Sequence, residues 1–140
     1  MSKRIVTQWY SLDARVTQPG TGTWTPNASI YEQPEGLVVL VELAGVKAEE
    51  VEVHIANQKL IISGNRRDPV CEGKSGTCRV KLMEMDMGHF ERIIPLPFRV
   101  EREEATALCR NGLLEVRLPR RAMGDDEVDL HQAIRLKESS

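Results

Sequence analysis

The strongest constraint on the fold of this chain is the alternation of apolar and polar residues in short segments. Residues 51–56, "VEVHIA", place three aliphatic side chains on one face of an extended chain and the residues between them on the other. Residues 113–118, "LLEVRL", alternate in the same way, with Glu115 and Arg117 opposite three aliphatic residues. A period of two residues is typical of half-buried β-strands rather than helices.

Turn signals separate these segments at short intervals. The dipeptide "NQ" at 57–58 precedes "KLIISG", and "NG" at 111–112 precedes "LLEVRLP", so each predicts a hairpin. Residues 80–97 are expected to form one or two strands broken near Gly88 and ended by Pro95 and Pro97. With seven or eight short strands and no long amphipathic helix, the chain is predicted to be all-β, an antiparallel immunoglobulin-like β-sandwich.

The composition changes outside this region and suggests three parts. Residues 1–23 are expected to be a short, flexible N-terminal arm, because "QPGTGT" is a linker signal. Residues 24–121 form the predicted sandwich, which contains a long loop over 64–79. Residues 122–140 are polar and rich in acids, and we expect a mobile C-terminal extension.

Global charge and hydropathy exclude several partners. The net charge of −2 over 140 residues provides no general attraction to nucleic acid or to an anionic membrane. No apolar run approaches the length of about 18 residues that spans a bilayer. The N-terminus has basic residues but no apolar signal-peptide core, so we expect a cytoplasmic protein.

No motif for catalysis, a cofactor or a metal is evident. The histidines His54, His89 and His131 are scattered, and HExxH, GxSxG and phosphate-binding glycine loops are absent from the sequence. We therefore predict no enzymatic activity, no cofactor and no metal site. The methionines of "MEMDM", residues 83–87, are interpreted as packing or interface residues rather than a soft-metal site. The arginine pairs at 66–67 and 120–121 are interpreted as solvated charge.

The three cysteines do not suggest a secreted disulfide scaffold. Cys71 and Cys78 lack the CxxC spacing of zinc and redox sites, and Cys109 is left over. We interpret Cys71 and Cys78 as two reduced thiols, because a reducing cytosol disfavours disulfides. A reversible disulfide across the flexible stretch "EGKSGT" is the alternative.

Four segments, taken in order, resemble the small heat shock protein family of bacterial type, whose core is the α-crystallin domain. "WTPNASIYEQPEGLVVLVELAGVKAEEVEVHI" resembles the opening strands, and "NQKLIISGNRR" resembles the next strand with its basic end. "GHFERIIPLP" resembles the Gly-x-Phe-x-Arg…Leu-Pro segment of the family. "ATALCRNGLLEVRLPR" resembles its Ala-x-x-x-Asn-Gly-x-Leu-x-Val-x-x-Pro signature, through Ala107, Asn111, Gly112, Leu114, Val116 and Pro119.

The resemblance implies an ATP-independent holdase that binds partly unfolded client proteins and suppresses their aggregation. It also implies a homo-oligomer assembled from dimers, in which the loop over 65–87 pairs with the partner's first strand region, 24–31. The residues expected at this contact are Val80, Leu82 and Met83 on the loop, and Trp24 and Ile30 on its target. The residues expected to bind clients lie in the arm: Ile5, Val6, Trp9, Tyr10 and Leu12.

The tail carries a near match to the Ile-x-Ile/Val motif of the family, in Ile134-Arg135-Leu136. On an extended strand, residues two apart point the same way, so this pair suits two adjoining pockets. We expect the pair to fill a groove between sheet edges, in the same chain or a neighbouring one, and thereby to hold the oligomer together. The expected lining residues are Val51, Val53, Ile55, Ala107 and Cys109.

Two alternatives remain open from the residues alone. A monomeric adaptor of the related CS-domain type would share the sandwich but lack the tail dipeptide and the long pairing loop. A redox-responsive β-domain would use Cys71 and Cys78. The mass in solution distinguishes the first, and thiol counting before and after mild oxidation distinguishes the second.

Overall fold

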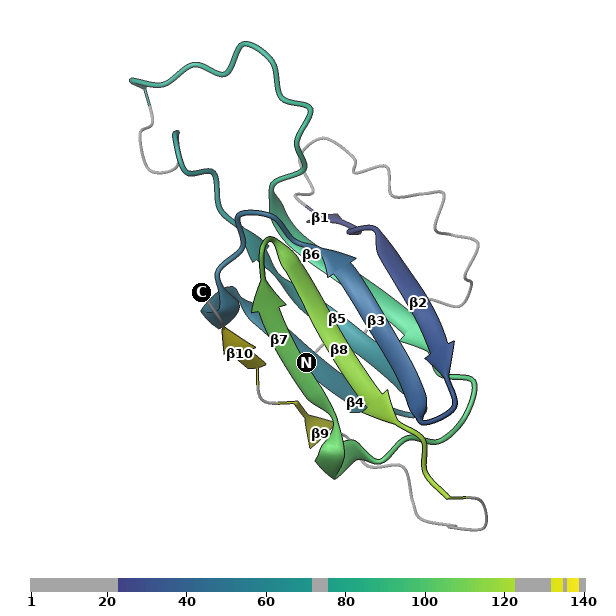
Figure 1. Ribbon diagram of the computed structural model, residues 1–140. Helices are drawn as coiled ribbons and strands as arrows, with labels where there is room; N and C mark the ends of the chain where they lie inside the picture. Colours follow the sequence, from purple (N-terminus) through teal and green to yellow (C-terminus); the bar gives the residue numbers. More distant parts are fainter. Residues whose placement is uncertain (1–22, 72–75, 123–131, 135, 139–140) are drawn as a thin grey trace.

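The computed structural model describes residues 23–71, 76–122, 132–134 and 136–138 of the chain. Two five-stranded sheets face each other, in the orders β1-β6-β5-β4-β9 and β10-β7-β8-β3-β2 (Figure 1). The long strands all pair antiparallel with one another, whereas β1 and β10 add parallel pairings at two sheet ends. The strands are β1 (Thr23–Trp24), β2 (Ala28–Gln33), β3 (Gly36–Glu42), β4 (Val51–Ala56), β5 (Lys59–Arg66), β6 (Gly88–Pro95), β7 (Thr106–Arg110), β8 (Leu113–Pro119), β9 (Gln132–Ala133) and β10 (Leu136–Glu138). Two single-turn 3₁₀ helices, η2 (Ala48–Glu50) and η3 (Arg102–Glu104), complete the described elements.

The all-β sandwich predicted from the sequence is confirmed. Eight strands lie between Thr23 and Pro119, and two more belong to the tail. Both predicted hairpins form at their dipeptides. Asn57 and Gln58 have φ of 52° and 59°, and Asn111 and Gly112 have φ of 54° and 79°. Positive φ at both central residues is the type I′ arrangement, whose twist matches that of the paired strands.

The core lies between the facing sheets and is made by the alternating aliphatic residues. On β4, the side chains of Val51, Val53 and Ile55 are buried while Glu52 is exposed. On β8, Leu114, Val116 and Leu118 are fully buried. The same cluster includes Leu37, Val39, Val41, Leu43, Leu60, Ile62, Phe90, Ile94, Leu96, Val100 and Ala107. This burial fixes the strand register, because a slip of one residue would turn the apolar face toward water.

Two regions differ from the expectation. Residues 80–87 form no strand, although Val80 was expected to begin one, and β6 begins only at Gly88. A lone extended segment has no neighbour to accept its backbone hydrogen bonds, so the single chain leaves it irregular. Residues 132–133 and 136–138 lie in the extension that was expected to be mobile, and they pair with β4 and β7, the edges where the tail was expected to dock.

Among the described residues, no helix combines the length and the apolar character that crossing a membrane requires.

Candidate tail groove and self-association surfaces

The groove lies where the sandwich is open at one side, between the β4 edge of one sheet and the β7 edge of the other. The tail occupies it and becomes the outermost strand of both sheets, as β9 beside β4 and β10 beside β7 (Figure 1). The tail therefore passes from one sheet to the other between β9 and β10. The crossing point is Ile134, which sits between the two short strands.

Backbone pairing sets the register of the tail. Ala133 lies opposite His54, and the Ile134 N–H donates to the Val53 carbonyl at 2.8 Å. On the other side Leu136 lies opposite Ala107, in a parallel ladder that continues to Glu138. These bonds satisfy backbone groups of two strand edges that would otherwise be open to another chain.

The two apolar residues of the tail motif, Ile134 and Leu136, are buried to different extents. Ile134 is 7% exposed and belongs to the core cluster of the sandwich. Leu136 is half-buried and packs against that cluster. The five residues expected to line the groove lie at these two edges: Val51, Val53 and Ile55 are buried on β4, Ala107 is buried on β7, and Cys109 is half-buried on β7. The structure thus brings the predicted tail and groove residues together, and it does so within one chain.

A second candidate surface is the free side of β2, the strand at the end of its sheet. In the described sheet β2 pairs with β3 alone, so its other backbone edge faces outward. Ile30 and Tyr31 on this strand are 44% and 51% exposed. An open strand edge with exposed apolar side chains is suited to β-strand addition by another chain.

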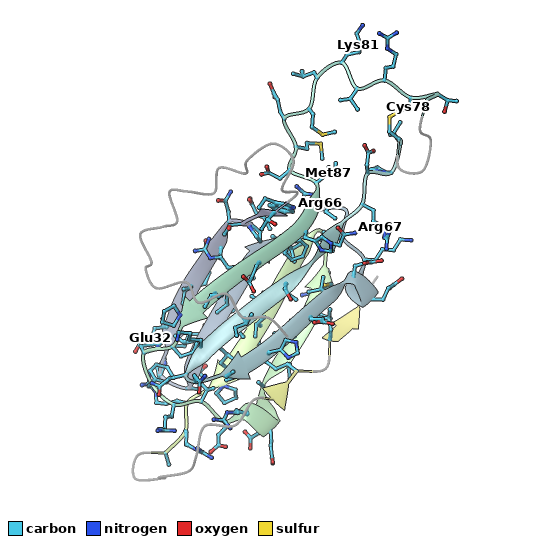
Figure 2. The ribbon with its side chains drawn as sticks, turned by 180° about the vertical axis from the view of Figure 1, so that it is seen from behind. Glu32, Arg66, Arg67, Cys78, Lys81 and Met87 are labelled. Carbon is cyan, nitrogen blue, oxygen red and sulfur yellow. A yellow bond between two sulfur atoms is a disulfide. The ribbon has the colours of Figure 1, made fainter. Side chains whose placement is uncertain are left out.

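The loop between β5 and β6 is the third candidate surface. It extends away from the sandwich, with Arg66 and Met87 near its base and Cys78 and Lys81 far from the sheets (Figure 2). Apolar side chains with no cover in the single chain follow one another along it: Val70, Val80, Leu82, Met83 and Met85. Leu82 is the most exposed of them, at 75%.

Trp24 has a role that the sequence did not suggest. Expected on the target of the loop, its side chain is instead only 4% exposed and packs against Phe90, with ring centroids 5.2 Å apart. Its Nε1–H donates to the Gly88 carbonyl at 3.1 Å. Trp24 therefore helps to fix the base of the loop, whereas Ile30 remains available on the surface.

Arg66 was interpreted as solvated charge, and that interpretation is wrong. Its guanidinium lies 4.4 Å from the centre of the Trp24 ring and donates to the Asp86 and Ala44 carbonyls at 2.9 and 3.1 Å. These contacts hold the two ends of the loop to the sandwich. No sequence pattern predicts them, since the partners lie 20 and more residues away.

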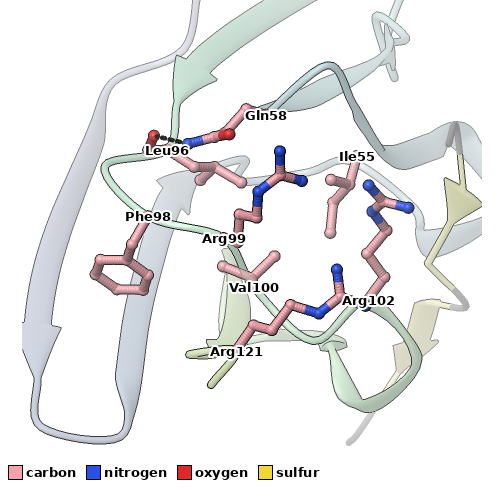
Figure 3. A pocket seen from close by; sticks show the side chains of 8 residues that line it. All are labelled: Ile55, Gln58, Leu96, Phe98, Arg99, Val100, Arg102 and Arg121. Atoms are coloured by element: carbon pink, nitrogen blue, oxygen red, sulfur yellow. Dashed lines mark hydrogen bonds between the residues drawn. The ribbon is translucent and has the colours of Figure 1, made fainter. Parts of the chain in front are cut away.

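The second arginine pair is also engaged with the fold. Arg120 donates to a Glu32 carboxylate oxygen at 3.2 Å and stacks over the Phe98 ring at 3.7 Å, and Arg121 lies 3.7 Å from Glu101. Figure 3 shows a hollow beside the groove, in which Arg99, Arg102 and Arg121 surround Val100 and Ile55. Gln58 and Leu96, which are joined by a hydrogen bond of 3.4 Å, complete it with Phe98.

Cys71 and Cys78, interpreted as reduced thiols, are joined by a disulfide in the structure, with Cα atoms 5.5 Å apart. The Cys71 N–H donates to Asp68 Oδ1 at 3.2 Å. Cys109 on β7 is not part of this disulfide. Within the described ranges no group of three or more His, Cys, Asp or Glu side chains is arranged to hold a metal ion. The predicted client-binding residues Ile5, Val6, Trp9, Tyr10 and Leu12, like Arg135 and His131, lie outside the described residues.

Solved structures of small heat shock proteins share this sandwich. The structure of Heat shock protein 16.0 from Schizosaccharomyces pombe superposes with a TM-score of 0.63 at 30% identity, covering 76% of this chain and 97% of that one. A small heat-shock protein from Xylella fastidiosa, described as having a distinct high order structure, gives a TM-score of 0.61 at 27% identity over 76% of this chain and 96% of its own.

Sequence comparison gives the same result. This chain belongs to the Hsp20/alpha crystallin family, whose sequence model matches residues 29–134. It is 32% identical to Heat shock protein 16 of S. pombe over 83% of this chain and 80% of that protein. It is 31% identical to a 17.7 kDa class II heat shock protein of Arabidopsis thaliana over 66% of this chain, but the match spans only 59% of the plant protein. Membership supports a chaperone role, and relatives from a yeast, a plant and a bacterium do not single out a bacterial type.

Proposed function

We propose that this protein is an ATP-independent holdase that binds partly unfolded proteins and works as a homo-oligomer assembled from dimers. The observation that carries the proposal is the seating of Ile134 between the edges of the two sheets. A tail that can dock on a groove of its own chain can dock on the same groove of another copy, because both grooves present identical edges. The stretch from Pro119 to Ile134 has an extended reach of roughly 50 Å, which suffices for a neighbouring subunit.

Dimers would form by exchange of the loop between β5 and β6. The free edge of β2, with Ile30 exposed, offers backbone partners and apolar contact to a strand formed by residues around Val80, Leu82 and Met83. This use of the loop is the one that the resemblance implies for bacterial and plant-type members of the family. It also accounts for the exposure of Leu82 in the single chain, since a partner strand would cover that side chain on pairing.

Holdase activity requires apolar surface that adapts to many clients. Burying apolar surface is worth about 25 cal/mol per Å², so weak and adaptable patches are enough when several act together. We propose that the arm around Trp9 and the surfaces released by tail exchange provide these patches. A cytoplasmic location stays a prediction from the sequence.

The test is suppression of heat-induced aggregation of a thermolabile client, followed by light scattering without nucleotide. The expected result is suppression at a stoichiometric excess of this protein, unchanged when ATP is added. Bovine serum albumin at the same mass concentration controls for crowding. Aggregation that proceeds equally with this protein and with the control would refute the holdase activity.

Assembly is tested separately by the solution mass of the full chain, measured by light scattering over a range of concentrations. A mass of several chains supports assembly. A mass of one chain at every concentration would overturn it and would favour the monomeric CS-type adaptor.

A further inference from the structure

We propose that Cys71 and Cys78 form a reversible redox site that controls how readily subunits exchange through the loop between β5 and β6. The inference rests on the proposed loop exchange and adds its regulation. The pair lies within the loop itself, and Cys109, the remaining cysteine, lies on β7 of the sandwich. Both loop cysteines are half-buried, so a small reagent can reach them.

The position of the disulfide relative to the apolar residues is the first argument. Cys78 stands two residues before Val80, where the exposed apolar stretch that includes Leu82 and Met83 begins. On the other side, Asp68 Oδ1 accepts hydrogen bonds from the N–H groups of Val70 and Cys71 at 2.8 and 3.2 Å. The cross-link therefore joins a locally ordered turn directly to the start of the segment proposed to pair with a partner.

The second argument is the length of the two arms that carry this segment. Arg66 and Gly88 lie opposite each other in the β5–β6 ladder, so both arms leave the sandwich at the same place. From Gly88 back to Met83, the last of the three pairing residues, the chain extends at most about 17 Å. From Arg66 to Val80 it extends about 48 Å when the thiols are free, but only about 30 Å through the disulfide, which spans 5.5 Å between Cα atoms.

The disulfide thus shortens the longer of the two arms and removes its slack. A loop held by two short arms samples fewer conformations before pairing, and it loses less freedom when it pairs. With the thiols reduced, one arm has a slack of about 18 Å and the pairing segment is less confined. The oxidised protein is therefore expected to hold its partner longer than the reduced one.

The reaction is thiol–disulfide exchange, which transfers two electrons and two protons between the cysteine pair and a thiol reagent. In reduction, a thiolate of a dithiol reductant attacks one sulfur of the pair, which releases the other cysteine and forms a mixed disulfide. The second thiol of the reductant then attacks the reductant's sulfur in that mixed disulfide and releases the remaining cysteine. Two protein thiols form, and the reductant leaves as a disulfide after giving two electrons and two protons. In oxidation, glutathione disulfide accepts those two electrons and leaves as two molecules of glutathione.

The experiment measures subunit exchange of the full chain after mixing two populations carrying donor and acceptor fluorophores. One sample is oxidised with glutathione disulfide and another is reduced with dithiothreitol. Subunit exchange is expected to be about tenfold slower in the oxidised sample, because confining the loop mainly lowers the rate at which subunits dissociate. Cys71→Ser and Cys78→Ser should exchange at the reduced rate in both samples, and Cys109→Ser, the matched control, should keep the difference.

Tryptic peptides establish the state of the pair in each sample. Trypsin cuts after Lys74, so residues 68–74 and 75–79 remain linked in the oxidised protein and separate in the reduced one. Equal exchange rates in oligomers whose peptides are linked and unlinked would overturn the redox control alone. Failure to link the peptides with the oxidant would overturn it as well. A chain that is monomeric in both states would instead overturn the assembly from which this control follows.

Discussion

Shortening Ile134 to alanine should release the tail from its groove. The side chain is 7% exposed and lies among core residues, so Ile134→Ala removes almost the whole of its buried aliphatic surface. The loss is about 2 kcal/mol, from three carbon atoms at roughly 0.8 kcal/mol each. Because ordering the tail, including the described residues 132–134 and 136–138, offsets much of the gross gain through lost chain entropy, the net stability of the seated tail is small. A loss of this size should lower the equilibrium constant between the seated and the released tail about thirtyfold, and with it the occupancy of the groove.

Hydrogen exchange followed by mass spectrometry measures this occupancy. The Ile134 N–H donates to the Val53 carbonyl, so its protection reports the seated state. Peptides that cover residues 132–138 and β4 should both lose protection in Ile134→Ala. Leu136→Ala should show a smaller loss, since Leu136 is only half-buried. The control is Leu113→Ala, an exposed leucine on β8, which should change neither peptide.

The concentration dependence of protection distinguishes the two places where the tail can dock. Docking within one chain gives the same protection at every concentration, whereas docking on a neighbour gives protection that falls with dilution. In the second case Ile134→Ala should also reduce the solution mass. Unchanged protection of the tail in Ile134→Ala, together with an unchanged mass, would refute the groove argument.

Two further predictions concern the sandwich and the loop. Gly64→Ala should lower the melting temperature by several degrees, a loss of about 1–3 kcal/mol, because a Cβ on β5 would clash with the Glu50 carbonyl oxygen and lie 2.7 Å from Phe90 Cζ. The neighbouring control, Ser63→Ala, should unfold within a degree or two of the wild type in the same calorimetric scan. Equal melting temperatures of the two variants would contradict the packing argument. Leu82→Asp should shift the assembly toward smaller species in sedimentation velocity, because a carboxylate is costly to bury at a paired strand. A sedimentation profile identical to that of the wild type would show that Leu82 is not covered by a partner.

How much the sequence predicts follows from the range over which each interaction acts. The hairpin at Asn111 and Gly112 and the buried face of β4 were predictable, because turn chemistry and alternation are local. The contacts of Arg66 were not, since a run of two arginines has the same appearance whether its partners are water or distant carbonyl groups. Residues 80–87 were misjudged for a related reason, because their β-like composition does not supply the neighbouring strand that pairing requires.

The sequence by itself determined the sandwich, its hairpins and the presence of an apolar pair in a polar tail. Alternation at a period of two and positive-φ turn residues leave few other ways to bury that surface. The groove for this pair was expected only through the resemblance to the family, and the tertiary structure decided that the pair seats on the edges of its own chain. Ile134 reaches the open side of the sandwich because folding brings the β4 and β7 edges together from positions more than 50 residues apart, and no local pattern encodes that meeting.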